Sequence, residues 1–108
     1  MPKINIKPLS VNEAWQGKRF KTSKYSQYIN NVLILLKPLE VPKTPLKITI
    51  VFGLSSKNAD IDNPVKCFID CLQKKYGFND RMIYEMHVKK VDVGKGKEFI
   101  EFDIKSIV

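Results

Sequence analysis

The chain has 108 residues, of which 44% are hydrophobic and 28% are charged, and its formal net charge is +8. A chain of this length fits one domain, residues 1–108, and its composition excludes a wholly disordered protein. No apolar run approaches the roughly 20 residues of a membrane-spanning helix, and the first residues lack the apolar core of a signal peptide. We therefore expect a cytoplasmic protein without a membrane partner.

The excess of positive charge indicates a polyanionic partner. Lysine and arginine side chains that bind phosphates release condensed counterions, and this favours binding to nucleic acid. A membrane surface is the competing polyanion, but no stretch of the chain combines an apolar helix face with a dense basic face. Nucleic acid is therefore the preferred partner.

The first predicted element is a short strand over residues 3–7, where isoleucines alternate with polar residues. The polar and basic stretch 10–24 is expected to be an irregular surface loop. A helix follows, with Thr22 or Ser23 as its N-cap and with apolar residues at three- and four-residue spacing. Pro38 should end or bend this helix.

A second strand is predicted over residues 46–52, because apolar and polar residues alternate there, and it should stop at Gly53. The second helix should begin with Asn63 as its N-cap and Pro64 in its first position, where the missing N–H does no harm. Gly77 fits the C-terminal end of this helix.

Residues 84–89 alternate in the same way and predict a third strand, and a turn at 94–96 leads to a fourth strand over 100–104. The order β-α-β-α-β-β predicts an α+β fold, with two helices packed on a small mixed four-stranded sheet. Cys67 and Cys71 lie one helical turn apart, so neither a disulfide nor a structural zinc site is expected from them.

Acidic residues gather in one part of this basic chain, with Asp60, Asp62, Asp70 and Asp80 within 21 residues. Asp60 and Asp62 should leave the same face of an extended segment, and Lys66 in the first turn of the second helix should reach the same space. Asp80 is expected to fold back toward this pair. Carboxylates held this close need a proton or a cation between them, and they suit Mg²⁺.

Two or three aspartates and a lysine are the groups that hydrolysis of a phosphodiester needs. A bound Mg²⁺ activates water and neutralises charge on the phosphate, and an ammonium group stabilises the transition state. The structural alternative is ordinary: Asp62-Asn63-Pro64 is a normal helix start, and Lys66 with Asp70 is a normal surface ion pair. The spacing alone leaves both interpretations open.

The segment from Asp60 to Leu72 reads D-x-D-N-x-x-K-x-x-x-D-x-L and is followed by Gly77-Phe78-Asn79-Asp80. Upstream lie Pro8 to Trp15 and the basic Lys18-Arg19-Phe20. Together these segments resemble the RusA-type Holliday junction resolvases, which are common in bacteriophage genomes, and the resemblance covers nearly the whole chain.

The resemblance implies a homodimer that binds branched DNA and makes paired symmetric nicks in four-way junctions, in DNA recombination and repair. It implies Mg²⁺, with Mn²⁺ as a substitute and no small-molecule cofactor, and the host cytoplasm if a phage encodes the protein. Lys66 is then the catalytic lysine, and Asp70 and Asn63 are its supporting neighbours. The carboxylates that the resemblance assigns to the metal are Asp60, Asp62 and Asp80.

The resemblance also implies DNA contacts from the N-terminal loop and from the loop before the second helix, residues 56–63. The candidate residues are Asn12, Trp15, Lys18, Arg19, Lys21, Lys57 and Lys89. Well-known family members carry a run of arginines where this chain has only Lys57, and often a doubled aspartate where it has Asn79-Asp80. A nuclease with a broader choice of substrate, including flaps and replication forks, is therefore an alternative.

Two further alternatives stay open. A restriction-type nuclease would use Asp103-Ile104-Lys105, a D-x-K triplet on the last strand, although this triplet lies near the chain end and has no convincing partner. A basic DNA-binding module without catalytic activity would use its aspartates only to cap a helix and to repel phosphate.

Overall fold

The computed structural model describes residues 1–10, 14–16 and 20–108, with the backbone alone at 15–16 and 20–21. The strands and helices in chain order are β1 (Lys3–Ile4), β2 (Trp15–Gln16), β3 (Phe20–Lys21), α2 (Ser23–Leu35), β4 (Leu46–Leu54), α3 (Val65–Tyr76), β5 (Ile83–Asp92) and β6 (Phe99–Ser106). A single 3₁₀ turn, Asp80–Met82, precedes β5 and is called the Asp80 turn below.

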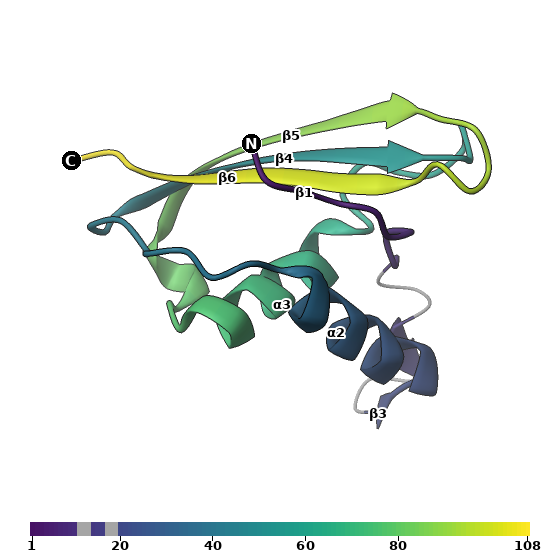
Figure 1. The fold of residues 1–108 in the computed structure, drawn as a ribbon, viewed down its shortest axis with the longest axis horizontal. Helices are drawn as coiled ribbons and strands as arrows, with labels where there is room; N and C mark the ends of the chain where they lie inside the picture. Colours follow the sequence, from purple (N-terminus) through teal and green to yellow (C-terminus); the bar gives the residue numbers. More distant parts are fainter. Residues whose placement is uncertain (11–13, 17–19) are drawn as a thin grey trace.

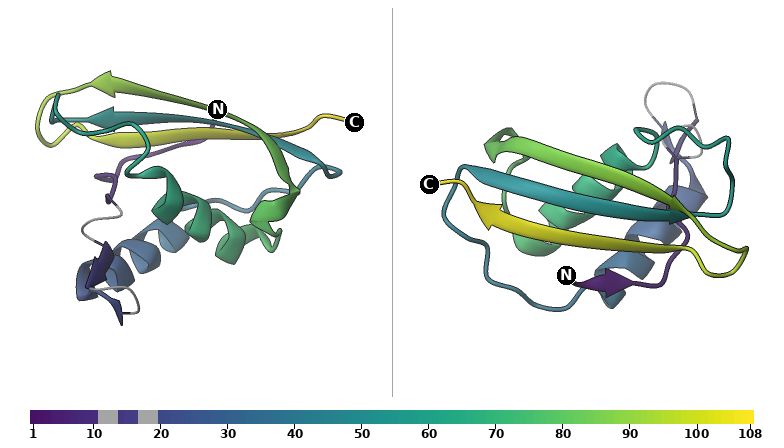
Figure 2. Two further views of the ribbon diagram at one scale, coloured as in Figure 1. Left: turned by 180° about the vertical axis from the view of Figure 1, so that it is seen from behind. Right: turned by 90° about the horizontal axis from the view of Figure 1, so that it is seen from above.

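The main sheet has the order β1-β6-β4-β5, with β4 parallel to β5 and antiparallel to β6. Parallel neighbours need a crossover connection, and α3 provides it between β4 and β5. The sheet forms one layer, and α2 and α3 pack against one of its faces (Figures 1 and 2). This arrangement confirms the predicted α+β fold, in which two helices cover a mixed four-stranded sheet.

The hydrophobic core lies between the sheet and the two helices. Alternate residues of β4 point into it, because successive side chains of a strand leave opposite faces. The helix side chains that face them are fully buried: Phe68 and Leu72 of α3 and Tyr25 and Val32 of α2. The ring of Phe68 packs edge-on against Phe102 of β6, at 5.6 Å between centroids. The core thus fixes α3 against the centre of the sheet.

Several predicted boundaries need correction. The stretch 10–24 is not wholly irregular, because β2 and β3 pair there as a small two-stranded ribbon. The strand β4 does not stop at Gly53 but continues to Leu54, paired with β6 on one side and β5 on the other. The N-cap of α3 is Pro64 and not Asn63, since the chain still turns at that residue.

Two helix ends agree with the sequence. Thr22 is the N-cap of α2, and its side chain accepts a hydrogen bond of 3.2 Å from the backbone N–H of Tyr25. Gly77 ends α3 in the left-handed conformation, with φ of 78°, which a residue with a side chain seldom adopts. No helix of the described residues is long and apolar enough to span a bilayer.

Candidate active site

Residues 60–64 form a turn that leads into α3. The N–H of Asn63 donates to the carbonyl of Asp60 at 3.3 Å, and the N–H of Val65 donates to the carbonyl of Asp62 at 3.2 Å. The expectation that Asp60 and Asp62 leave one face of an extended segment is therefore wrong. The local hydrogen bonds of the turn separate the two carboxylates and direct them to different hollows of the surface.

Three of the four predicted catalytic residues line one groove between α3 and β5. Asp62 precedes the helix, Lys66 lies in its first turn, and Asp80 begins the turn that follows the helix. Arg81 adds a second cation to the same groove. The groove has a volume of about 610 Å³, and the rest of its lining is Ile61, Val65, Ile69, Ile83, Tyr84, Glu85, Met86 and Val88. The motif residues therefore share a mainly apolar, open groove.

Asp60 lines a second hollow, of about 200 Å³, beside Lys7, Asn63 and Glu98. Hydrogen bonds from its own backbone N–H and from Ser55 lower the pKa of Glu98, so this carboxyl stays ionised near Asp60. Within residues 1–10, 14–16 and 20–108, no group of three acidic, cysteine or histidine side chains is placed to hold one metal ion. The structure thus groups Asp62 with Asp80 and leaves Asp60 in the adjoining hollow.

Asp70 connects the groove to the core. One of its carboxylate oxygens accepts a hydrogen bond of 2.7 Å from the hydroxyl of Tyr25, and the other lies 3.5 Å from the ammonium of Lys66. The Lys66 side chain is 60% exposed, whereas that of Asp70 is only 22% exposed. Asp70 therefore contacts the lysine from the more buried side, and most of the Lys66 side chain stays exposed where it lines the groove.

Tyr25 is a buried hydrogen-bond donor that the sequence suggested only as a core residue. Burial, and then the hydrogen bond to Asp70, raise the pKa of Tyr25 far above its usual range. The hydroxyl stays protonated at any physiological pH, so it donates to Asp70 throughout. The sequence contained little indication of this role, because a tyrosine on the apolar face of a helix normally predicts a core residue.

Gln73 is a second residue that sequence reasoning missed. Its side-chain N–H donates to Asp70 at 3.4 Å, and its side-chain oxygen accepts from the backbone N–H of Asp80 at 2.9 Å. Gln73 lies three residues after Asp70 and seven after Lys66, and this spacing places it on the same helix face. The spacing could have indicated its role. The amide links the two halves of the motif.

The loop before Asp60 is tied to the sheet by Lys90. The ammonium of this lysine donates to the carbonyl of Ala59 at 2.8 Å and to that of Lys57 at 3.4 Å. The side chain of Lys57 itself is exposed. The loop is therefore held by its backbone, and its one basic side chain is accessible to a partner.

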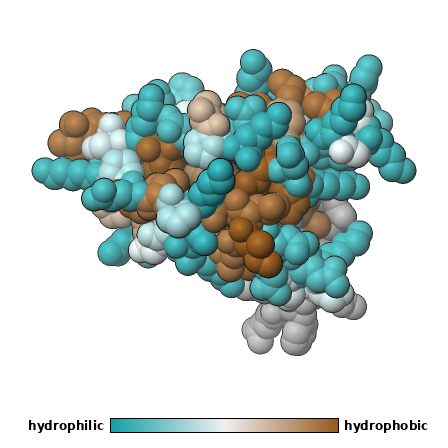
Figure 3. Space-filling model, in the orientation of Figure 1, coloured by the Kyte–Doolittle hydropathy of each residue, from teal (hydrophilic) through white to brown (hydrophobic). Residues whose placement is uncertain are grey.

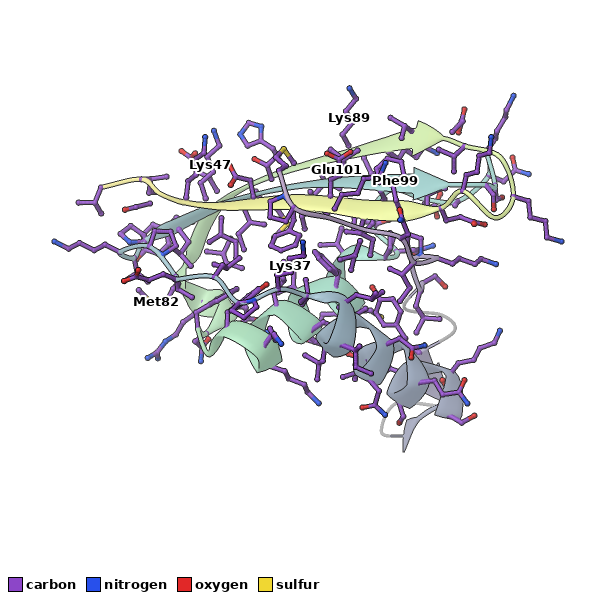
Figure 4. The ribbon with its side chains drawn as sticks, in the orientation of Figure 1. Lys37, Lys47, Met82, Lys89, Phe99 and Glu101 are labelled. Atoms are coloured by element: carbon purple, nitrogen blue, oxygen red, sulfur yellow. The ribbon has the colours of Figure 1, made fainter. Side chains whose placement is uncertain are left out.

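The other predicted DNA contacts fall on different parts of the chain. Lys89 projects from β5 on the face of the sheet that turns away from the helices, and so away from the groove (Figure 4). The backbones of Trp15 and Lys21 are partners in the β2–β3 ribbon. The remaining candidates, Asn12, Lys18 and Arg19, lie outside the described residues.

The D-x-K triplet of the rival nuclease lies on β6. Asp103 and Lys105 form an ion pair of 3.5 Å with each other, with side-chain exposures of 32% and 72%. Asp103 is paired with Thr49 of β4, and neither Asp103 nor Lys105 lines the groove between α3 and β5. The triplet is therefore separate from the motif residues.

A comparison with known protein families also covers the motif residues. A family model described as endodeoxyribonuclease RusA matches residues 10–103, which include the whole motif and both walls of the groove. No curated protein sequence matches the chain. The RusA family comprises nucleases that resolve Holliday junctions, and the match spans most of the 108 residues. The chain therefore belongs to the RusA endodeoxyribonuclease family.

Proposed function

We propose that this protein is a Mg²⁺-dependent endonuclease that cuts four-way DNA junctions by paired symmetric nicks. One observation carries the proposal: Asp62, Lys66 and Asp80, which are up to 18 positions apart in the sequence, line one open groove. Two acidic groups and an accessible ammonium are the parts that phosphodiester hydrolysis uses. The match to the RusA endodeoxyribonuclease family supports DNA junctions as the class of substrate.

The donor set fits magnesium. Mg²⁺ is usually held by one or two carboxylates and keeps several waters, and Asp62 and Asp80 are the motif carboxylates in the groove, whose lining also includes Glu85 of β5. Asp60 lies in the adjoining hollow, so a set of all three carboxylates requires the 60–64 turn to change shape on binding. The ion, when bound, lowers the pKa of a coordinated water and offsets charge on the phosphate; Mn²⁺ substitutes for it.

The chain's own side chains orient the DNA and stabilise the reaction. Lys66 presents its ammonium to the groove, where it binds a phosphate oxygen as negative charge develops there. Arg81 lines the same groove and adds a planar group with several donors for phosphate. The net charge of +8 draws the DNA backbone toward the protein. Lys57, exposed on the loop before Asp60, is a further phosphate contact.

We propose that the protein acts as a homodimer, because a four-way junction needs two symmetric cuts. The strand β5 is an edge strand of the sheet, and two of its apolar side chains are accessible, Tyr84 at 68% and Met86 at 39%. An unpaired edge with exposed apolar side chains is the kind of surface that a second subunit covers. The β5 edge is therefore the proposed contact between the two copies. Because Tyr84 and Met86 also line the groove, the second copy would lie along its β5 margin and leave the α3 side, with Lys66, open to DNA.

The experiment is incubation of a synthetic four-way junction with the protein in Mg²⁺, Mn²⁺ or Ca²⁺, followed by a denaturing gel. Paired nicks at symmetric positions in Mg²⁺ and Mn²⁺ are expected, with linear duplex left intact. Binding without incision in any of these ions would favour the non-catalytic module. Cutting of flaps and forks as fast as four-way junctions would favour the broader nuclease. The role of such a nuclease in recombination and repair would lie at the replication fork.

A further inference from the structure

Gln73 lies on α3 with both ends of its side-chain amide engaged. The nitrogen donates to Oδ1 of Asp70 at 3.4 Å, and the oxygen accepts from the backbone N–H of Asp80 at 2.9 Å. The orientation of the amide is unambiguous, because a backbone N–H only donates and an ionised carboxylate only accepts. No charged side chain can make both contacts at once, since the task needs a donor and an acceptor.

The Asp70 end of this link is anchored in the core. Oδ2 of Asp70 accepts from the hydroxyl of Tyr25 at 2.7 Å, and Tyr25 is fully buried. Oδ1 is shared between the amide of Gln73 and the ammonium of Lys66, at 3.5 Å. The carboxylate thus sets the position of the lysine and of the glutamine together.

The Asp80 end of the link is a short turn on the surface. Asn79 caps this turn, since its side chain accepts from the N–H of Arg81 at 3.0 Å and its carbonyl accepts from the N–H of Met82 at 3.0 Å. These bonds lie within the turn, so they fix its shape and not its direction relative to α3. The bond from Asp80 to Gln73 ties the turn to α3, between Phe78, which packs against the core, and Ile83, which pairs with β4.

We propose that Gln73 is a positioning residue of the active site, which holds the Asp80 turn against α3 so that Asp80 and Lys66 face the same groove. The inference rests on the proposed nuclease function, because it assigns a task to Asp80 and Lys66. Hydrogen-bonded neighbours of metal-binding groups typically change metal affinity by about 10- to 100-fold when they are removed. Gln73 is expected to have an effect of this size.

The test uses two variants of the full chain and one control. Gln73→Met keeps the length of the side chain and removes both hydrogen bonds. Gln73→Glu keeps an acceptor for the N–H of Asp80 and loses the donor to Asp70. Gln27→Met is the control, since Gln27 is an exposed glutamine on α2. The measurements are amide hydrogen exchange of Asp80 by NMR and Mg²⁺ affinity by calorimetry, with the melting temperature recorded for each.

In Gln73→Met, the Asp80 amide is expected to exchange about tenfold faster, as for the loss of one hydrogen bond. Mg²⁺ is expected to bind about tenfold more weakly. In Gln73→Glu, the Asp80 amide should stay protected, because its acceptor is kept. Gln27→Met should match the unchanged protein in both measurements. A general loss of stability would instead accelerate exchange throughout α3 and would not separate the methionine variant from the glutamate variant.

Wild-type protection of Asp80 in Gln73→Met, or equal exchange in both Gln73 variants, would overturn the assignment. The exchange experiment contains neither metal nor DNA, so it stands apart from the nuclease test. If the unchanged protein bound no Mg²⁺ and cut no junction, the proposed function would fail whatever the amide of Asp80 did.

Discussion

Tyr25 and Tyr28 lie close together on α2, and both are buried, but their hydroxyl groups have different surroundings. The hydroxyl of Tyr25 donates to Asp70 at 2.7 Å. The hydroxyl of Tyr28 is buried and has no hydrogen-bond partner among the described residues. A bond to a charged acceptor stabilises a fold, whereas a buried polar group without a partner costs free energy.

Replacing each tyrosine by phenylalanine should therefore change stability in opposite directions. Tyr25→Phe is expected to lower the free energy of unfolding by about 2 kcal/mol, because Asp70 loses a close donor. Tyr28→Phe should raise it by about 1 kcal/mol, because an unpaired hydroxyl leaves the core. Urea unfolding of both variants measures the difference. Equal losses in the two variants would show that the hydroxyl of Tyr28 has a partner after all.

The same tyrosines make the fold sensitive to alkali. Burial raises the pKa of Tyr25 and of Tyr28 above the usual value of 10.0. Above this pH the unfolded chain loses the phenolic protons while the folded chain keeps them, so the unfolded state binds fewer protons and stability falls. The contribution of these raised pKa values to the free energy of unfolding is complete below pH 10. Above pH 10 it falls by about 1.4 kcal/mol per pH unit for each tyrosine.

Urea midpoints between about pH 9 and about pH 12 should show this decline. Tyr28→Phe is the informative variant, because it removes one of the tyrosines whose pKa is raised, a set that also includes Tyr76, without breaking a hydrogen bond. Its slope against pH is expected to be shallower than that of the unchanged protein. Parallel slopes would mean that Tyr28 ionises in the folded state as it does in the unfolded chain.

Single residues of the groove should separate binding from cutting. Asp62→Asn is expected to keep junction binding and to lose cleavage, because it removes a proposed metal ligand and a negative charge from the groove proposed to bind phosphate. Lys66→Ala should cut about 100-fold more slowly, since the ammonium acts on the transition state. Gel shift and single-turnover cleavage assays measure the two properties.

Asp103→Asn is the matched control for these variants. Asp103 is an aspartate already engaged in an ion pair on β6, outside the groove. The Asp103→Asn variant should cut DNA at the rate of the unchanged protein. Loss of cutting in Asp103→Asn, with Asp62→Asn still active, would show that the active site is the D-x-K triplet.

At the scale of one element, β4 depends on a contact with its neighbour β6. Gly53 is opposite Phe99, and a Cβ atom at Gly53 would collide with the Phe99 ring. The ammonium of Lys3 lies over that ring, 4.4 Å from its centroid. The aromatic ring thus occupies the space that the glycine leaves, which lets the strand continue through a residue that is otherwise a weak strand former.

Gly53→Ala is therefore expected to lower the free energy of unfolding by about 1–3 kcal/mol, the usual cost of overpacking. The same substitution made together with Phe99→Ala should cost much less, because the collision is gone. A double-mutant cycle with urea unfolding measures this coupling. Additive losses would show that Gly53 is required for its backbone conformation and not for the contact with Phe99.

At the scale of the whole molecule, large apolar side chains remain exposed on α2, on β5 and at Met1, Ile61, Ile107 and Val108. Ile34 and Leu35 are exposed near the end of α2, at 81% and 42%. Figure 3 shows apolar atoms at the surface where α2 meets the sheet. Tyr84 and Met86 are exposed on β5 and line the groove. Only the second pair combines apolar exposure with an unpaired strand edge, so we expect the second subunit there.

Light scattering should give a mass of twice 12.5 kDa for the unchanged protein in solution. Tyr84→Lys together with Met86→Lys is expected to shift the protein to the monomer, because two charges cannot be buried without partners. Ile34→Lys, on the other exposed apolar site, should leave the dimer intact. The reverse pattern would place the interface on α2 and would separate it from the groove.

Much of the fold was predictable from the sequence, because the relevant signals are local. The alternation in 46–52 and the helical spacing after Thr22 reflect the periods of a strand and of a helix, and Gly77 reflects the conformation of one residue. These signals act over a few positions, so they identify elements and their order. The spacing of the motif identified the family for the same reason.

Tertiary structure decided how those elements combine at the site. The turn at 60–64 separates Asp60 from Asp62, and the link of Tyr25, Asp70, Gln73 and Asp80 joins α2, α3 and the Asp80 turn. Each of these contacts depends on where the core places distant segments, which no local pattern encodes. The sequence by itself thus determined the elements, the charge and the chemical groups. Packing of the helices on the sheet decided which of those groups meet.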